Sequence, residues 1–333
     1  MPLKGISMNL LNRLKSITAA LACLGGLCAA SSVPAQEVWP NRTVRIVVPF
    51  PAGGASTDGM ARAFAQELAK ELKTSVIVEN RPGGGTSVGT LAVKMQPADG
   101  HTLLFQSDGL FNAKLTTPQL AYEPSEFEII SPLAQTNYAF IVPANRGWEQ
   151  LENLRGLDRE LDVGTLGIGV SSYSILAARM TKHLQIKHRM VPYKGGVDGV
   201  KAVMAGEIDG YFATVGLTQT VMSSSKVRVL AYTGSPDRTS FFPGVKTFYE
   251  LGMTDMVFNS YYGLAVRADT PDKIKSALAG AVHKVVDSDA MKAARQRLHL
   301  EDYRGSTEDY RRDVVRMFKQ YEAAASDGGK ATQ

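Results

Sequence analysis

The sequence predicts an α/β protein of two lobes, each a mainly parallel sheet flanked by helices, with a ligand cleft between them. Apolar strand-like segments alternate with amphipathic helix-like segments, which is the order of a parallel sheet. This order is complete by about residue 107 and starts again near residue 139. In both parts a glycine-rich turn follows an early strand, and open parallel sheets bind ligands at the carboxyl ends of their strands.

Residues 1–35 have the pattern of a cleavable secretory signal peptide. Arg13 and Lys15 precede an apolar run over 17–30, and small residues occupy the positions before Gln36. Met8 is an alternative start. The run is too short to span a membrane, so we expect an exported protein located in the periplasm.

Both cysteines, Cys23 and Cys28, fall inside this leader, so the mature chain is expected to contain no disulfide and no thiol nucleophile. Lipoprotein cleavage at either cysteine is the alternative. Three of the positive charges also belong to the leader, and without them the formal charge falls from +5 to +2. A chain so nearly balanced in charge does not have the composition of a nucleic-acid binder.

The first part of the chain opens with the strand predicted over 44–50. A helix over 59–73 follows, because Met60, Phe64 and Leu68 recur every four residues on one face. The next elements predicted are strands at 75–80 and 101–107 and a helix at 88–95. These segments read as β-α-β-α-β.

The second part repeats the pattern and the chain then ends in helices. Strands are predicted at 139–145, 160–169, 188–193, 208–214, 226–234 and 263–269, and helices at 171–184, 195–207, 271–298 and 307–325. The last helix follows a capping sequence at Ser306 to Asp309. We expect lobe 1 to contain residues 36–139 and 264–333, and lobe 2 to contain 140–263.

Catalytic and metal-binding signatures are absent from the sequence. None of the five histidines forms an H-E-x-x-H motif, and neither a G-x-S-x-G elbow nor a phosphate-binding P-loop motif occurs. We therefore expect no catalytic residue, no metal and no cofactor.

Three glycine loops instead supply hydrogen-bond donors. They contain Gly53 and Gly54, the run 83–85, and the three glycines of 164–169, with serine and threonine hydroxyls beside each. Backbone N–H groups at a strand-to-helix turn suit a carboxylate. The alternative is that each loop is a tight turn with an ordinary helix cap.

Other side chains near these loops have two interpretations each. Asp58 either caps its helix or faces the ligand, and Lys194 is either a counter-charge for an acid or an ordinary surface lysine. Four tyrosines could wall an aromatic ligand or belong to the core: Tyr193, Tyr211, Tyr261 and Tyr262.

Six segments in order resemble a known family. They are WPNRTVRIVVPFPAGGASTD, VIVENRPGGGTSVG, PADGHTLLF, VPYKGG, AGEIDGYF and VRVLAYTG, which span Trp39 to Gly234. Together they resemble the substrate-binding receptors of tripartite tricarboxylate transporters, the Bug family. The resemblance implies a type II-like periplasmic binding protein of the Venus-flytrap kind.

The resemblance also implies a function and a site. The receptor would capture a small organic acid, an aliphatic di- or tricarboxylate or an aromatic acid, and deliver it to the large and small permease subunits. A monomer suits the hinge closure of such a receptor. Family receptors hold a carboxylate at the first strand-to-helix loop, here 51–58, and at a facing loop, here 165–172. The candidate ligand-binding residues are Pro51, Ala52, Gly53, Gly54, Ser56, Thr57, Asp58, Gly85, Thr86, Ser87, Ser107, Thr165, Gly167, Ile168, Gly169, Val170, Ser171, Ser172, Tyr193 and Thr214.

The chain departs from the family pattern at three places. The first loop is one residue longer, the second loop ends in Thr86 and Ser87, and Tyr173 lies where the family often has a histidine. These differences concern the identity of the ligand rather than its class. Two other functions stay open: a ligand sensor that signals to a membrane kinase, and an exported α/β enzyme.

Overall fold

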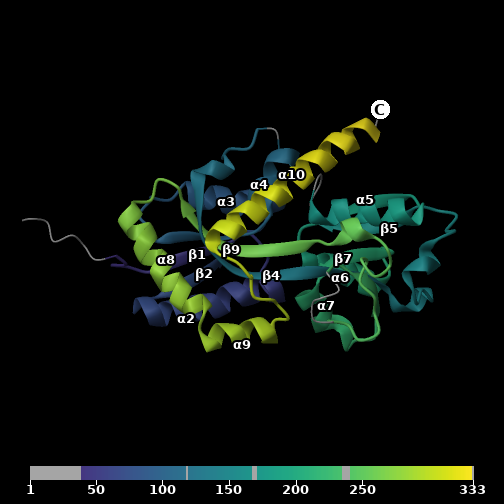
Figure 1. Cartoon of the computed structure of the whole chain (residues 1–333), viewed down its shortest axis with the longest axis horizontal. Helices are drawn as coiled ribbons and strands as arrows, with labels where there is room; N and C mark the ends of the chain where they lie inside the picture. The colour runs from purple at the N-terminus through teal and green to yellow at the C-terminus, as the bar shows by residue number, and fades with distance from the viewer. Residues whose placement is uncertain (1–38, 118, 167–170, 235–240, 332–333) are drawn as a thin grey trace, which may run out of the picture. The chain divides into compact units, whose positions relative to one another are not determined.

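The computed structural model describes residues 39–117, 119–166, 171–234 and 241–331, so the predicted signal peptide lies outside the described residues. All the elements below belong to one unit that starts at Arg42. Within the described residues, nine strands form one mixed sheet (Figure 1). They are β1 (Val44–Val48), β2 (Val76–Asn80), β3 (Thr102–Gln106), β4 (Phe127–Pro143), β5 (Leu161–Leu166), β6 (His188–Tyr193), β7 (Gly210–Thr214), β8 (Val227–Tyr232) and β9 (Asn259–Arg267).

The first part of the sheet has the predicted parallel core. Strand β1 pairs in parallel with β2 on one side and β3 on the other, so Ile46 lies opposite both Val78 and Leu103. The crossovers are α2 (Met60–Leu72) and α3 (Ser87–Lys94), within one residue of the predicted bounds. The expected β-α-β-α-β unit is confirmed, and α4 (Gly109–Thr116) follows it.

The second part repeats this arrangement. Strand β5 pairs in parallel with β6 and β7. The helices of this part are α5 (Ser172–Leu184), α6 (Gly196–Ala205) and α7 (Val215–Met222). Helices α4 and α7, with eight residues each, were not predicted from the sequence.

The two parts share strand β4, whose predicted start at residue 139 was wrong. The strand begins at Phe127, and its first half pairs antiparallel with β9 as far as Asn137. From Tyr138 onward it pairs antiparallel with β7 and β8 instead. Figure 1 shows β4 and β9 extending from the strands of the first part toward β7. The result is a two-lobed α/β fold with a continuous mixed sheet.

Separate apolar clusters fill the two parts. Val47, Leu104 and Tyr122 belong to a cluster beneath α3 and α4. Phe140 and Phe212 belong to a larger cluster built on β4, β5, β7 and β8. Each lobe therefore buries its own core, as expected for compact lobes of this size.

The C-terminal helices return to the first part. The single helix predicted over 271–298 is two, α8 (Asp272–Val286) and α9 (Asp289–Arg297), because Ser288 caps a new helix by accepting a bond from the Met291 N–H. Helix α10 (Thr307–Ala331) begins at the predicted cap, where Ser306 and Asp309 bond reciprocally. No helix among the described residues is both long and apolar enough to cross a membrane.

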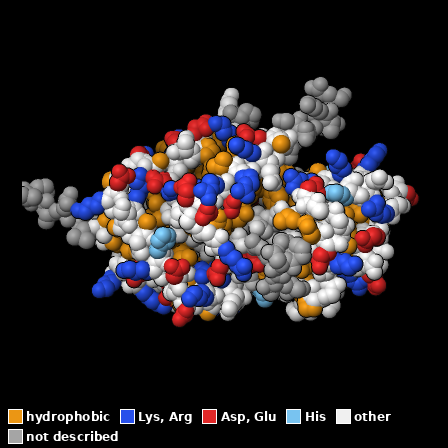
Figure 2. Space-filling view, viewed as in Figure 1, with side chains coloured by type: hydrophobic (Ala, Val, Ile, Leu, Met, Phe, Trp, Pro, Cys, Tyr) orange, Lys and Arg blue, Asp and Glu red, His pale blue; other side chains and the backbone are white. Residues whose placement is uncertain are grey.

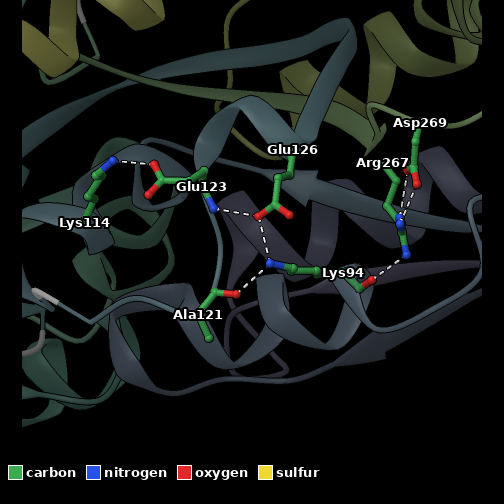
Figure 3. Close-up of polar contacts among 7 residues, drawn as sticks. All are labelled: Lys94, Lys114, Ala121, Glu123, Glu126, Arg267 and Asp269. Atoms are coloured by element: carbon green, nitrogen blue, oxygen red, sulfur yellow. Dashed lines mark hydrogen bonds and ion pairs between the residues drawn. The ribbon is translucent and has the colours of Figure 1, made fainter.

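A polar network fixes the end of β9 to the first part (Figure 3). Arg267 donates to the carbonyl oxygens of Lys94 and Gln96, both at 2.8 Å. The Lys94 ammonium in turn donates to Glu126 at 2.9 Å. The Lys94 bond and a bond from the Glu123 N–H lower the pKa of Glu126. The network joins α3, the start of β4 and β9 in one place.

Charged groups of both signs are interspersed on the visible face of the molecule (Figure 2). Many are paired: Arg311 with Glu128, and Arg312 with Asp309, both on or beside α10. This mixture agrees with the small formal charge, +2, of the sequence after residue 35.

Candidate functional site

The carboxyl ends of the parallel strands surround one cavity. Its lining comes from the segments after β1, β2, β3, β5, β6 and β7, and from the central strands β4 and β9. The described residues that line it are Phe50, Pro51, Gly54, Ser56, Thr57, Gly85, Thr86, Ser107, Asp108, Gly109, Asn112, Ala113, Tyr138, Leu166, Ser171, Ser172, Tyr173, Gly196, Val197, Thr214, Leu217, Ser260 and Tyr262. This is the edge at which open α/β sheets bind ligands.

Six helices begin at this cavity. The π-helical turn η1 (Ala55–Gly59) runs directly into α2, and the first residues or caps of α3, α4, α5, α6 and α7 all belong to the lining. The first N–H groups of a helix have no partner within the helix, and the helix dipole is positive at this end. Their convergence directs unpaired backbone N–H groups and positive dipole ends toward the cavity, an arrangement that favours an anion.

The first loop is held in place by Asp58. Gly53 has φ of +87°, which favours glycine, and its N–H donates to Asp58 Oδ2 at 2.9 Å. Arg62 Nε donates to the same oxygen at 3.0 Å, and Asn80 Nδ2 donates to Oδ1 at 2.9 Å. Burial alone would raise the pKa of Asp58, but the bonds from Arg62, Gly53 and Asn80 and the Arg62 charge bring it below its usual value. Asp58 therefore acts on the loop rather than on the cavity.

The facing loop is fixed by hydroxyl groups. Ser171 caps α5, accepting a bond from the Ser174 N–H, and its hydroxyl lies 3.1 Å from that of Thr165. In the wall of the cavity the hydroxyls of Ser56 and Thr214 are 2.9 Å apart, and both residues are buried. This bond connects the β1 loop with the start of α7.

The described lining of the cavity contains an acidic side chain and no basic one. No Lys, Arg or His among the described residues lines the cavity, whereas Asp108 does. Its Oδ2 accepts hydrogen bonds from the hydroxyls of Ser172 and, at 2.7 Å, Tyr321 of α10. The described residues contain no group of three or more His, Cys, Asp or Glu placed to hold a metal ion.

Tyrosines form the deep wall. Tyr138, Tyr173 and Tyr262 line the cavity, and the rings of Tyr138 and Tyr173 meet edge to face at 5.5 Å. Burial, reinforced by the negative charge of Asp108, raises the pKa of all three. They are neutral at physiological pH and provide aromatic faces as well as hydroxyls.

Half of the predicted site residues lie in this lining. They are Pro51, Gly54, Ser56, Thr57, Gly85, Thr86, Ser107, Ser171, Ser172 and Thr214. Five others lie outside the lining but next to it in sequence: Ala52 and Gly53 in the loop after β1, Asp58 in η1, Ser87 at the start of α3 and Thr165 in β5. Gly167, Ile168, Gly169 and Val170 are outside the described residues.

Tyr193 and Lys194 line a second hollow, which shares Phe50, Gly85, Thr86 and Leu166 with the first. Of the other tyrosines considered, Tyr262 lines the main cavity. Tyr211 is fully buried in the core, and Tyr261 packs against Tyr303 and Tyr310.

Sequence reasoning missed the polar groups contributed by α4. Asp108 and Asn112 lie one turn apart, and both line the cavity. The only local signal was the position of Asp108 directly after a predicted strand, where aspartate is common in turns. Ser260 was missed because β9 reaches the site from a distant part of the chain, whereas Tyr262 on the same strand had been considered as a possible aromatic wall.

The fold and this site define the class of two-lobed α/β binding proteins. Residues 60–324 match the model of the tripartite tricarboxylate transporter family receptor. The chain belongs to this family, which is a family of binding proteins and not of enzymes. The protein is similar to BugT of Bordetella pertussis, with 28% identity over 287 residues, 83% of this chain and 87% of BugT.

Solved structures share the fold. Rpa4515 of R. palustris, solved with adipate, has a TM-score of 0.80 at 24% identity and covers 87% of this chain and 98% of its own. MatC of Rhodopseudomonas palustris, solved with malate, has a TM-score of 0.77 at 23% identity. The match covers 86% of this chain and 100% of MatC. BugD, a periplasmic binding protein, has a TM-score of 0.78 at 23% identity. The match covers 87% of this chain and 99% of BugD.

Proposed function

We propose that this protein is a periplasmic receptor that binds a small carboxylate-bearing organic acid in the cavity. It then delivers the acid to the membrane subunits of a tripartite transporter. The observation that carries the proposal is the convergence of six helix N-termini on a cavity whose described lining has no cationic side chain. Such a site favours a negative charge held by neutral donors.

The related structures support the same ligand class. Two proteins of this fold were solved with malate and with adipate, and both acids carry two carboxylates. In this chain the Gly54 and Ser56 loop and the start of α5 supply donors on opposite sides of the cavity. We assign the carboxylate to these groups and propose that the other predicted site residues support them.

Closure around the ligand would be a hinge motion. We place the hinge in β4 between Asn137 and Tyr138, where its partner changes from β9 to β7 and β8. We keep the lobe bounds expected from the sequence, 36–139 with 264–333 for lobe 1 and 140–263 for lobe 2, whose boundary in β4 falls two residues after this hinge. The receptor acts as a monomer, and the transporter recognises its closed form.

The test is ligand-induced stabilisation of the chain without residues 1–35. The protein is unfolded and refolded to remove retained ligand and then melted with mono-, di- and tricarboxylates, aromatic acids and uncharged analogues. An acid at 100 times its dissociation constant adds roughly 2.7 kcal/mol, which is a shift of about several degrees. A stabilising effect confined to acids supports the proposal, and no shift with any acid overturns it.

A matched pair of variants locates the site. Gly54 has ordinary extended dihedral angles, and a Cβ there meets only the Thr57 hydroxyl, at 2.9 Å. Gly54→Leu should therefore fold and lose ligand-induced stabilisation. Gly280→Leu is the control, because Gly280 is exposed on α8 with open space around it. Equal ligand response in both variants would remove the first loop from the site.

Transport is separated from signalling by a membrane experiment. Purified receptor with and without its acid is incubated with vesicles that contain the permease subunits. Ligand-dependent uptake supports the transport role. Ligand binding without uptake, together with ligand-dependent capture of a membrane kinase, would favour the sensor alternative.

A further inference from the structure

Asp108 has a carboxylate oxygen without a donor inside the cavity. The residue lies at the N-cap position of α4 but makes no capping bond with its side chain. Oδ2 accepts from Ser172 and Tyr321, whereas Oδ1 has no hydrogen-bond donor among the described residues. No Lys, Arg or His among the described residues lines the cavity beside it. The Asp108 carboxylate is thus partly buried and has no basic side chain beside it in the described lining.

Asn112 adds a second acceptor on the same wall. It lies one turn further along α4, so its side chain is on the same face as Asp108. The residue is 6% exposed, and its Oδ1 is buried with no hydrogen-bond partner. An unsatisfied buried acceptor of this kind is rare and costly in a folded protein. A ligand that brings an N–H donor would satisfy it.

The neighbouring tyrosines favour the same kind of ligand group. Tyr138, Tyr173 and Tyr262 line the cavity, and the Asp108 charge acts on all three hydroxyls. Aromatic faces attract cations through the ring quadrupole. An ammonium group beside Asp108 would lie among these rings, whereas a second carboxylate in the same place would meet a like charge and two acceptors.

We propose that the ligand is an amino acid in the broad sense, a carboxylic acid that also carries a protonated amine. The amine donates to Asp108 Oδ1 and Asn112 Oδ1, and the carboxylate lies at the helix N-termini. The inference rests on the proposed function and narrows its ligand class from organic acids to zwitterionic acids.

The test compares acids that differ only in the amine. Aspartate, malate and succinate form one series, and 2-aminoadipate and adipate form another, each measured by calorimetric titration of the stripped protein. The amine-bearing member should bind about 10- to 100-fold more tightly, the range for a hydrogen bond to a charged group. Equal or tighter binding of the amine-free acids overturns the inference but leaves the proposed function intact. No binding of any acid overturns both.

Variants connect the preference to these residues. Asp108→Asn keeps the shape and removes the charge, so the preference for the amine should fall by at least about tenfold. Binding of amine-free acids should stay the same or improve. Asp289→Asn, at a fully exposed position of α9, is the control and should keep the wild-type preference.

A second variant keeps the test decisive if Asp108→Asn folds poorly. Asn112→Leu replaces the unsatisfied amide by an apolar group of similar size, so the fold should be retained. It should also reduce the preference for the amine. An unchanged preference in either folded variant would contradict the proposal.

Discussion

The backbone N–H of Gly53 donates to Oδ2 of Asp58, five residues later, at 2.9 Å. The same carboxylate accepts from Arg62 and Asn80, and Asn80 also donates to the carbonyl of Phe50. One nearly buried side chain thus joins the end of β1, the end of β2 and the start of α2. The loop that lines the cavity is fixed before any ligand arrives, which reduces the entropy cost of binding.

Replacing Asp58 by alanine should loosen this loop. The change leaves three donors without their acceptor, so we expect the free energy of unfolding to fall by about 1–3 kcal/mol and ligand affinity to fall with it. Urea unfolding and calorimetric titration measure the two effects. Arg62→Ala is the control, because Arg62 is half exposed and its loss should cost less than about 1 kcal/mol. Equal midpoints for Asp58→Ala and wild type would contradict the assignment.

The same carboxylate predicts a pH dependence. Its pKa in the folded protein is below the ordinary value of 3.8, so it stabilises the fold at neutral pH, and this contribution is lost as the pH falls through the lowered value. The stability difference between wild type and Asp58→Ala should be constant near pH 7 and shrink below about pH 3.8. Urea titrations at several pH values test this. A difference that grows on acidification would show that the folded-state pKa is raised instead.

Some elements of the fold could be predicted from the sequence, and others could not. Strand β1 and helix α2 were predictable because an apolar run and a four-residue apolar period are local patterns. The first half of β4 was not, because it contains buried polar residues such as Gln135 and Asn137. Their partners Glu301 and Asn259 lie more than a hundred positions away in the sequence.

The candidate site shows the same division. The glycine and hydroxyl loops after β1 and β5 carry local signals, and their described residues include much of the cavity lining. Asp108 has no such signal, since its partner Tyr321 arrives from α10, 213 positions later. Local patterns predict where a cavity forms, whereas the charge inside it depends on the tertiary fold.

Thr86 is strained, and relieving the strain should stabilise the protein. It has φ of +88° and ψ of −12°, a region that β-branched residues rarely adopt, and its buried hydroxyl has no partner. Such strain costs of order 1–3 kcal/mol and is concentrated at functional sites. We expect Thr86→Gly to raise the free energy of unfolding by about 1 kcal/mol after loss of the buried methyl group, and to weaken ligand binding.

The matched control for this variant is Thr90→Gly in the same helix. Thr90 lies within the regular part of α3 and donates to the Thr86 carbonyl at 3.1 Å. Glycine there should destabilise the protein by roughly 1 kcal/mol or more. Thermal and urea unfolding compare the two. If both variants lose stability to the same extent, Thr86 is not strained.

Gly216 at the start of α7 is closely approached by two other segments. A Cβ there would lie 2.4 Å from the backbone oxygen of Leu298 and 2.8 Å from the hydroxyl of Ser56. Because the backbone of Leu298 cannot move aside as a side chain can, Gly216→Ala should destabilise the protein by about 1–3 kcal/mol. It should also weaken ligand binding, since the Ser56 to Thr214 bond in the cavity wall must shift.

The control for Gly216→Ala is a variant that we expect to change the free energy of unfolding in the opposite direction. Gly280→Ala places the same methyl group in open space on exposed helix α8, where alanine is preferred over glycine by roughly 0.5–1 kcal/mol. Urea unfolding should therefore show one variant below and the other above wild type. If Gly216→Ala is as stable as wild type and binds ligand normally, α7 can move away from Leu298 without disturbing the cavity. The contact between these segments would then be looser than their backbone distances require.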